Sequence, residues 1–148
     1  MKKYLLTAAI AAILASAFAA TAFAQQDDKT PEQREKEFYE AIEKEVERLE
    51  DQLELADWQV FYVDSILTHD YKCLQDEYAN LTASKVSNSD LYYDAQDKWM
   101  EKIYVAMHKV LNEEQWAKYE KIGAARDKKA RDKRLEKKMK KAAKKQDR

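Results

Sequence analysis

Glycine and proline are nearly missing from this chain, which has one of each among its 148 residues. Turns between β-strands depend heavily on these two residues, so a sheet protein of this length would need many more of them. Residues that favour helices, chiefly Ala, Glu, Lys, Leu and Gln, fill the sequence instead. The sequence therefore predicts an all-α fold.

The first 24 residues have the pattern of a cleavable secretory signal peptide. Lys2 and Lys3 form a short basic start, an uncharged alanine-rich stretch spans residues 5–18, and Ala22-Phe23-Ala24 supplies the small-x-small pattern that signal peptidase needs. The apolar stretch is shorter than the roughly 20 residues that span a bilayer, so we expect cleavage after Ala24 and no retained membrane helix. The prediction is an exported, periplasmic protein without a lipid anchor.

Charge is unevenly distributed over the rest of the chain. Residues 25–57 contain 13 acidic and 5 basic residues, a net charge of −8, whereas residues 126–148 contain 13 basic and 4 acidic residues, a net of +9. The basic segment has only Leu135 and Met139 as large aliphatic residues, so we expect a helical or disordered tail. We divide the chain into a signal peptide (1–24), a helical domain (25–125) and this basic tail (126–148).

Two long helices are predicted in the first half of the domain. Thr30, Pro31 and Gln33 form a capping pattern at the start of the first helix, and the second should span residues 57–83. Apolar residues recur in both at steps of three and four, as on one face of a helix. They are Phe38, Ile42, Val46 (or Glu45), Leu49 and Leu53 in the first, and Val60, Val63, Leu67, Tyr71, Leu74, Tyr78 and Leu81 in the second.

A polar break at residues 84–90 separates these helices from two more. Ser87, Asn88 or Ser89 can cap the third helix, which should end near Leu111. The fourth begins at Glu113 and loses its apolar face after Gly123. Their predicted inward faces are Tyr92, Ala95, Trp99, Ile103, Ala106 and Val110 in the third, and Trp116, Tyr119 and Ile122 in the fourth.

Helices of about 25 residues reach roughly 37 Å, and a single apolar face on each favours a layer over a closed ball. We therefore expect about four helices in an elongated antiparallel, hairpin-like layer that forms a homodimer. A compact monomeric bundle is the alternative.

Two pentads of the form Leu-x-x-x-Gln lie at predicted helix starts: Leu55 to Gln59 and Leu111 to Gln115. In the second, Asn112 can cap, Gln115 can return a hydrogen bond to the cap, and Leu111 can pack on Trp116. The first has Ala56 at the cap position, and losing a capping side chain costs about 1 kcal/mol.

These paired pentads resemble the LTxxQ family of periplasmic helical stress proteins, the Spy- and CpxP-like proteins. The resemblance covers most of the chain after residue 24, although neither pentad has the threonine of the motif. It implies a thin, curved antiparallel homodimer that binds unfolding clients without ATP, or a partner of a sensor of envelope stress. It also implies that the pentads are structural corners.

Several aromatic residues and one methionine lie off the predicted buried faces. Tyr62, Tyr93, Tyr104 and Met107 could form a semi-exposed client surface, because rigid amphipathic rings and flexible thioethers suit adaptable binding. Packing in a dimer interface is the alternative.

His69 and Cys73 are one helical turn apart, with Asp70 and Asp76 nearby, and are weak candidates for a metal site. Two ligands are too few, so we predict no bound metal and no cofactor. Cys73 is the only cysteine, and we expect either a half-buried thiol or an intermolecular disulfide.

No catalytic pattern is present: there is no nucleophile with a spaced base and no glycine-rich phosphate loop. The expected function is that of an ATP-independent, chaperone-like holdase or envelope-stress binding protein of the periplasm. The alternatives are a regulatory or structural envelope protein with one dedicated partner, or a metal-binding stress protein. The basic tail is either a solubilising terminus or a contact to anionic clients, lipid headgroups or lipopolysaccharide, and export makes nucleic acid an improbable partner.

Overall fold

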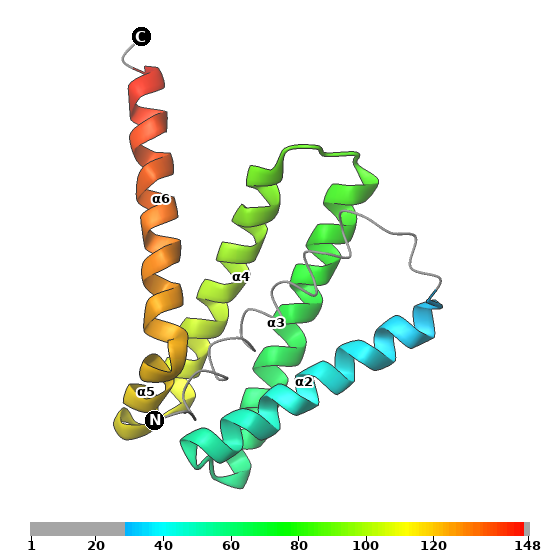
Figure 1. The fold of residues 1–148 in the computed structure, drawn as a ribbon, viewed down its shortest axis with the longest axis vertical. Coiled ribbons are helices and arrows are strands. Elements are labelled where there is room, and N and C mark those ends of the chain that lie inside the picture. Colours follow the sequence, from blue (N-terminus) through cyan, green and yellow to red (C-terminus); the bar gives the residue numbers. More distant parts are fainter. Residues whose placement is uncertain (1–28, 147–148) are drawn as a thin grey trace, which may run out of the picture.

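A computed structural model describes residues 29–146, so the predicted signal peptide lies outside the described residues. The chain forms helices throughout, and the described residues include no strand, which confirms the all-α fold class. Figure 1 shows α3 and α4 as an antiparallel hairpin, with α2 and α6 diverging on either side of it. The elements are α2 (Pro31–Leu53), α3 (Asp57–Ala83), α4 (Ser89–Val110), α5 (Glu113–Tyr119), the π-helical turn η1 (Glu120–Ala124) and α6 (Ala125–Gln146).

The helix starts follow from local chemistry. At α2, Thr30 Oγ1 accepts from the Gln33 N–H at 3.2 Å, and Gln33 Oε1 accepts from the Thr30 N–H at 2.9 Å. At α4, Asn88 is the residue that caps, and its side chain accepts from the Asp90 N–H at 3.0 Å. Each of these bonds satisfies a backbone donor that has no partner inside the helix.

The main core lies where α2 packs on the α3–α4 hairpin. The predicted face of α2 is buried along its whole length, from Phe38 to Leu53, with Val63 and Leu67 of α3 and Ile103, Met107 and Leu111 opposite. A smaller core of Leu74, Tyr78, Ala95 and Trp99 fills the far end of the hairpin.

The inward face of α4 differs from the predicted one near its C-terminal end. Met107 is fully buried, while Ala106 and Val110 are only half-buried. Since α2 crosses the hairpin on one side, the face of α4 that turns toward α2 is covered there. The one-residue offset of Met107 from the expected face places it in the core shared by α2 and the hairpin.

The fourth helix is interrupted after Tyr119. In η1, Gly123 has φ of +146°, a conformation that only glycine adopts without strain, and the chain then continues into α6. Ile122, predicted to face inward, is 39% exposed here because this joint redirects the chain away from the core. None of the helices in the described part combines the length and apolar character needed to cross a membrane.

Candidate binding surfaces

The two Leu-x-x-x-Gln pentads, 56 residues apart in sequence, meet at one corner of the molecule. Gln59 and Gln115 are both buried, and Leu55 and Leu111 are part of the main core. Each glutamine also serves its own helix start: Gln59 Oε1 accepts from the Ala56 N–H at 3.0 Å, and Gln115 Oε1 accepts from the Asn112 N–H at 3.1 Å.

The two amides bond to each other in both directions. Gln59 Nε2 donates to Gln115 Oε1 at 2.6 Å, and Gln115 Nε2 donates to Gln59 Oε1 at 2.9 Å. The second N–H of Gln59 reaches the Val110 carbonyl at 2.9 Å, and that of Gln115 reaches the Glu54 carbonyl at 3.2 Å. Every polar atom of both amides is therefore used, and each pentad closes the end of the helix that precedes the other.

The caps of the two pentads are unequal, as their sequences imply. Asn112 Oδ1 accepts from the Gln115 N–H at 2.9 Å, whereas Ala56 has no side-chain acceptor. The sequence indicates the local role of each glutamine. It gives no sign of their mutual bond, because that bond depends on how α2 and α4 are placed.

The residues predicted as a client surface do not form one surface. Met107 has no exposed area, so its place on a client surface was predicted wrongly; it lies in the core beneath α2. Tyr104 is half-buried and donates its hydroxyl to Glu120 Oε1 at 2.8 Å, while its ring packs edge-on to Trp116. Tyr62 and Tyr93 are more than half exposed but belong to different elements.

Tyr62 instead belongs to a compact aromatic cluster at the start of α3, with Trp58 and Phe61. The side chain of Trp58 is 57% exposed, that of Phe61 68% and that of Tyr62 51%. Tyr62 packs edge-on to both neighbours, with ring centroids 6.1 Å from Trp58 and 5.7 Å from Phe61. The sequence signal is their offset from the buried positions Val63 and Leu67, which turns them outward.

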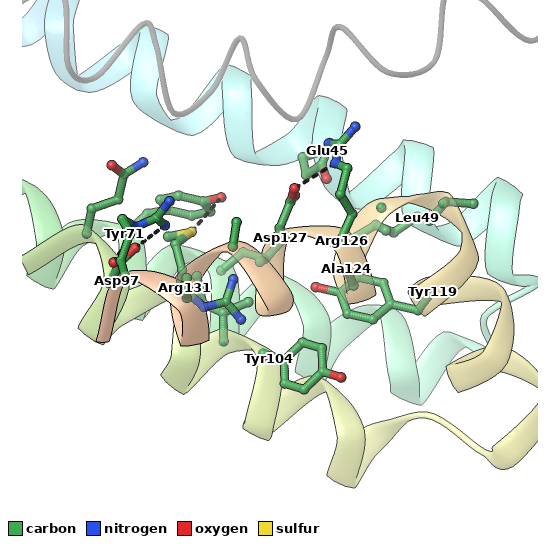
Figure 2. A pocket seen from close by; sticks show the side chains of 18 of the residues that line it. Glu45, Leu49, Tyr71, Asp97, Tyr104, Tyr119, Ala124, Arg126, Asp127 and Arg131 are labelled. Atoms are coloured by element: carbon green, nitrogen blue, oxygen red, sulfur yellow. Dashed lines mark hydrogen bonds and ion pairs between the residues drawn. The ribbon is translucent and has the colours of Figure 1, made fainter. Parts of the chain in front are cut away.

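A cavity of about 340 Å³ lies between the α2–α4 body and the start of α6 (Figure 2). Tyr71, Tyr104 and Tyr119 line it together with apolar residues such as Leu49 and Ile103. Burial raises the pKa of the Tyr119 hydroxyl to about 12, with Glu45 adding to the shift. Burial also raises the pKa of Tyr104 to about 12, helped by its bond to Glu120. The cavity is thus lined by apolar side chains, by tyrosine hydroxyls that stay neutral at physiological pH, and by charged side chains such as Glu45 and Arg131.

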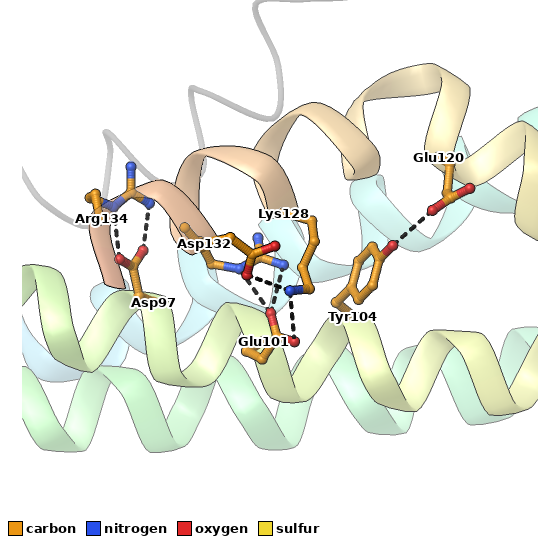
Figure 3. A network of polar contacts seen from close by, with 8 residues as sticks. Asp97, Glu101, Tyr104, Glu120, Lys128, Asp132 and Arg134 are labelled. Atoms are coloured by element: carbon orange, nitrogen blue, oxygen red, sulfur yellow. Dashed lines mark hydrogen bonds and ion pairs between the residues drawn. The ribbon is translucent and has the colours of Figure 1, made fainter. Parts of the chain in front are cut away.

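An ion-pair ladder joins α4 to α6 (Figure 3). Arg134 binds both carboxylate oxygens of Asp97 at 2.6 and 2.7 Å, and Glu101 receives Arg131 at 3.2 Å and Lys128 at 3.5 Å. Lys138 pairs with Asp94 further along. Arg131 is the only buried residue among the described side chains of α6, so no apolar side chain of α6 enters the core.

The metal candidates lie close together but remain incomplete. Cys73 Sγ is 3.8 Å from His69 Nε2, and His69 Nδ1 contacts Asp70 Oδ1 at 2.8 Å. Within residues 29–146, no group of three histidine, cysteine, aspartate or glutamate side chains is arranged to hold a metal ion. Cys73 is half-buried and unpaired in the single chain.

The chain matches no family model, and no curated protein or solved structure is significantly similar to it.

Proposed function

We propose that this protein is an ATP-independent, holdase-like binding protein of the periplasm, acting on unfolded segments of other proteins. The observation that carries the proposal is the aromatic cluster of Trp58, Phe61 and Tyr62. Three large rings lie more than half exposed on little more than one turn of helix. A soluble protein without a ligand for such a surface would normally cover it.

The cluster suits weak, sequence-tolerant binding. Its rings make edge-on contacts with one another, so they are held in place and lose little conformational entropy when a client arrives. The resemblance to the LTxxQ stress proteins, carried by the two pentads, points to the same activity and to a homodimer.

An aggregation assay tests this function. At near-stoichiometric ratios and without nucleotide, the protein should slow the aggregation of several unrelated unfolding proteins. Replacing Trp58, Phe61 and Tyr62 by serine should reduce this protection at least about fivefold, because the exposed apolar area of the cluster is lost.

A matched control removes the same number of exposed apolar side chains elsewhere, through Leu91→Ser, Leu135→Ser and Met139→Ser. This variant should protect as the unaltered protein does. If the unaltered protein protects no client, the holdase proposal is lost. A single envelope protein recovered with it reproducibly would then favour the alternative of one dedicated partner.

A further inference from the structure

Helix α6 has two faces with different tasks. One face makes the ion-pair ladder to α4, through Arg131, Arg134 and Lys138. Six exposed lysines lie on the outer side of the helix, each three or four residues from another of them, and five of them line one shallow hollow together with Glu136. We call these six the lysine stripe: Lys129, Lys133, Lys137, Lys140, Lys141 and Lys144.

The lysine stripe has almost no compensating charge. Helix α6 contains 12 basic and 3 acidic residues. Asp127 pairs with Arg126, Asp132 with Lys128, and Glu136 with Lys140. Apart from Lys140, the stripe makes no ion pair among the described residues, so its positive charge faces solvent.

The stripe runs away from the acidic part of the protein, which meets the start of α6 at the cavity lined by Glu45 and Arg131. Helix α2, with 9 acidic and 4 basic residues, diverges from α6 on the opposite side of the hairpin (Figure 1). A flat polyanion can therefore meet the stripe from Lys133 to Lys144, along about 16 Å of helix, on the side away from that cavity.

The residue type favours a diffuse anionic surface over a single bound phosphate. Arg131 and Arg134, which could grip one phosphate with two hydrogen bonds, are committed to Glu101 and Asp97. The stripe contains only lysines, which act as flexible point charges. Pairing with an acidic helix of a second copy would consist of exposed ion pairs, each of which contributes little.

We propose that the lysine stripe docks the protein on the surface of a bilayer that contains anionic phospholipid, by contact with lipid headgroups. The contact is electrostatic and leaves the helical body outside the bilayer. It does not depend on the holdase activity, because the aromatic cluster is on a different helix.

Vesicle co-sedimentation tests this docking, using the chain from Gln25 onward and vesicles of phosphatidylcholine with or without about 30 mol% phosphatidylglycerol. We expect binding to the anionic vesicles alone, and its loss at about 0.5 M NaCl. Neutralising Lys133, Lys137, Lys141 and Lys144 to glutamine should weaken binding at least about tenfold, since each lysine near such a surface contributes separately.

The control variant neutralises four exposed lysines outside α6 and so has the same net charge: Lys44, Lys85, Lys109 and Lys121 to glutamine. It should bind within about twofold of the unaltered protein. Equal weakening by both variants would mean that net charge, and not the stripe, drives binding, and would overturn the proposal. So would unaltered binding by the stripe variant, or no binding of the unaltered protein. Sedimentation equilibrium of the same variants without lipid would then show whether the stripe serves self-association instead.

Discussion

Two regions hold parts of the same chain together by opposite means. One is the glutamine corner, where Gln59 and Gln115 meet, and the other is the α4–α6 seam, which is formed by the ion-pair ladder. At the corner, Gln59 and Gln115 are buried and exhaust their hydrogen bonds on each other and on two helix ends. At the seam, charged side chains such as Arg134 and Asp97 meet at the surface, with a cavity beside them. The corner should therefore govern global stability, and the seam should respond to salt with little effect on the core.

The substitution that should destabilise the glutamine corner most is Gln115→Leu. It removes both Gln59–Gln115 bonds and the bonds of Gln115 to the Glu54 carbonyl and the Asn112 N–H, while Gln59 keeps its bonds to Ala56 and Val110. Unsatisfied buried groups cost about 1–3 kcal/mol each when water cannot reach them. We expect a loss of about 3 kcal/mol in the free energy of unfolding, measured by urea denaturation.

The double variant Gln59→Leu/Gln115→Leu sharpens this result. Removing both amides leaves neither one unpaired. The double variant should therefore lose at least about 1 kcal/mol less free energy of unfolding than the two single variants lose together. Strictly additive losses would contradict a mutual bond.

The unequal caps provide a paired experiment. Asn112→Ala should lower stability by about 1 kcal/mol, because the Gln115 N–H loses its acceptor. Ala56→Asn should raise stability by up to about 1 kcal/mol, since position 56 already has the extended backbone of a cap, with φ −75° and ψ 155°. Thermal melts of both variants measure the difference, and a destabilising Ala56→Asn would show that the first corner has no room for a cap.

Alkaline pH tests the lining of the cavity. The folded pKa of Tyr119 is about 12, above the unfolded value near 10, so the folded state keeps its proton longer. The resulting stability is complete below pH 10 and declines as the pH rises toward 12. Tyr119→Phe should remove about 1 kcal/mol of the loss between pH 9 and pH 11, as measured by denaturant melts. An unchanged pH slope would mean that the hydroxyl is solvated.

The seam should give the smallest change in global stability. Arg134→Gln removes one exposed ion pair, which contributes about 0.5 kcal/mol or less. Hydrogen exchange should nevertheless speed up in α6 in this variant, and in the unaltered protein at about 1 M NaCl, while the amides around Gln59 keep their protection. Equal acceleration in both regions would show that they unfold as one unit.

The sequence predicts the helices well where a local signal exists. Thr30, Pro31 and Gln33 mark the start of α2, and the buried positions of α3 follow the step of three and four from Val63 to Tyr78. These features depend on neighbours within one turn, so the linear sequence contains them.

Features that depend on how the helices pack on one another cannot be predicted from neighbouring residues in this way. Met107 looks like a surface residue from its register, but it lies in the core that α2 forms with the α3–α4 hairpin. The bond between Gln59 and Gln115, and the ladder from Asp94 to Glu101, join segments that the sequence does not bring together. Their residue types are visible in the sequence, but their partners are not.

The shape of the core has a consequence for how this chain can evolve. No apolar side chain of α6 enters the core, so core packing does not limit which residues this helix tolerates. Charge and helix propensity limit them instead. A gene could lengthen, shorten or recharge this last helix while the corner and core stay intact. Related chains should therefore vary most beyond Gly123, which makes α6 the part of the molecule most open to new attachments.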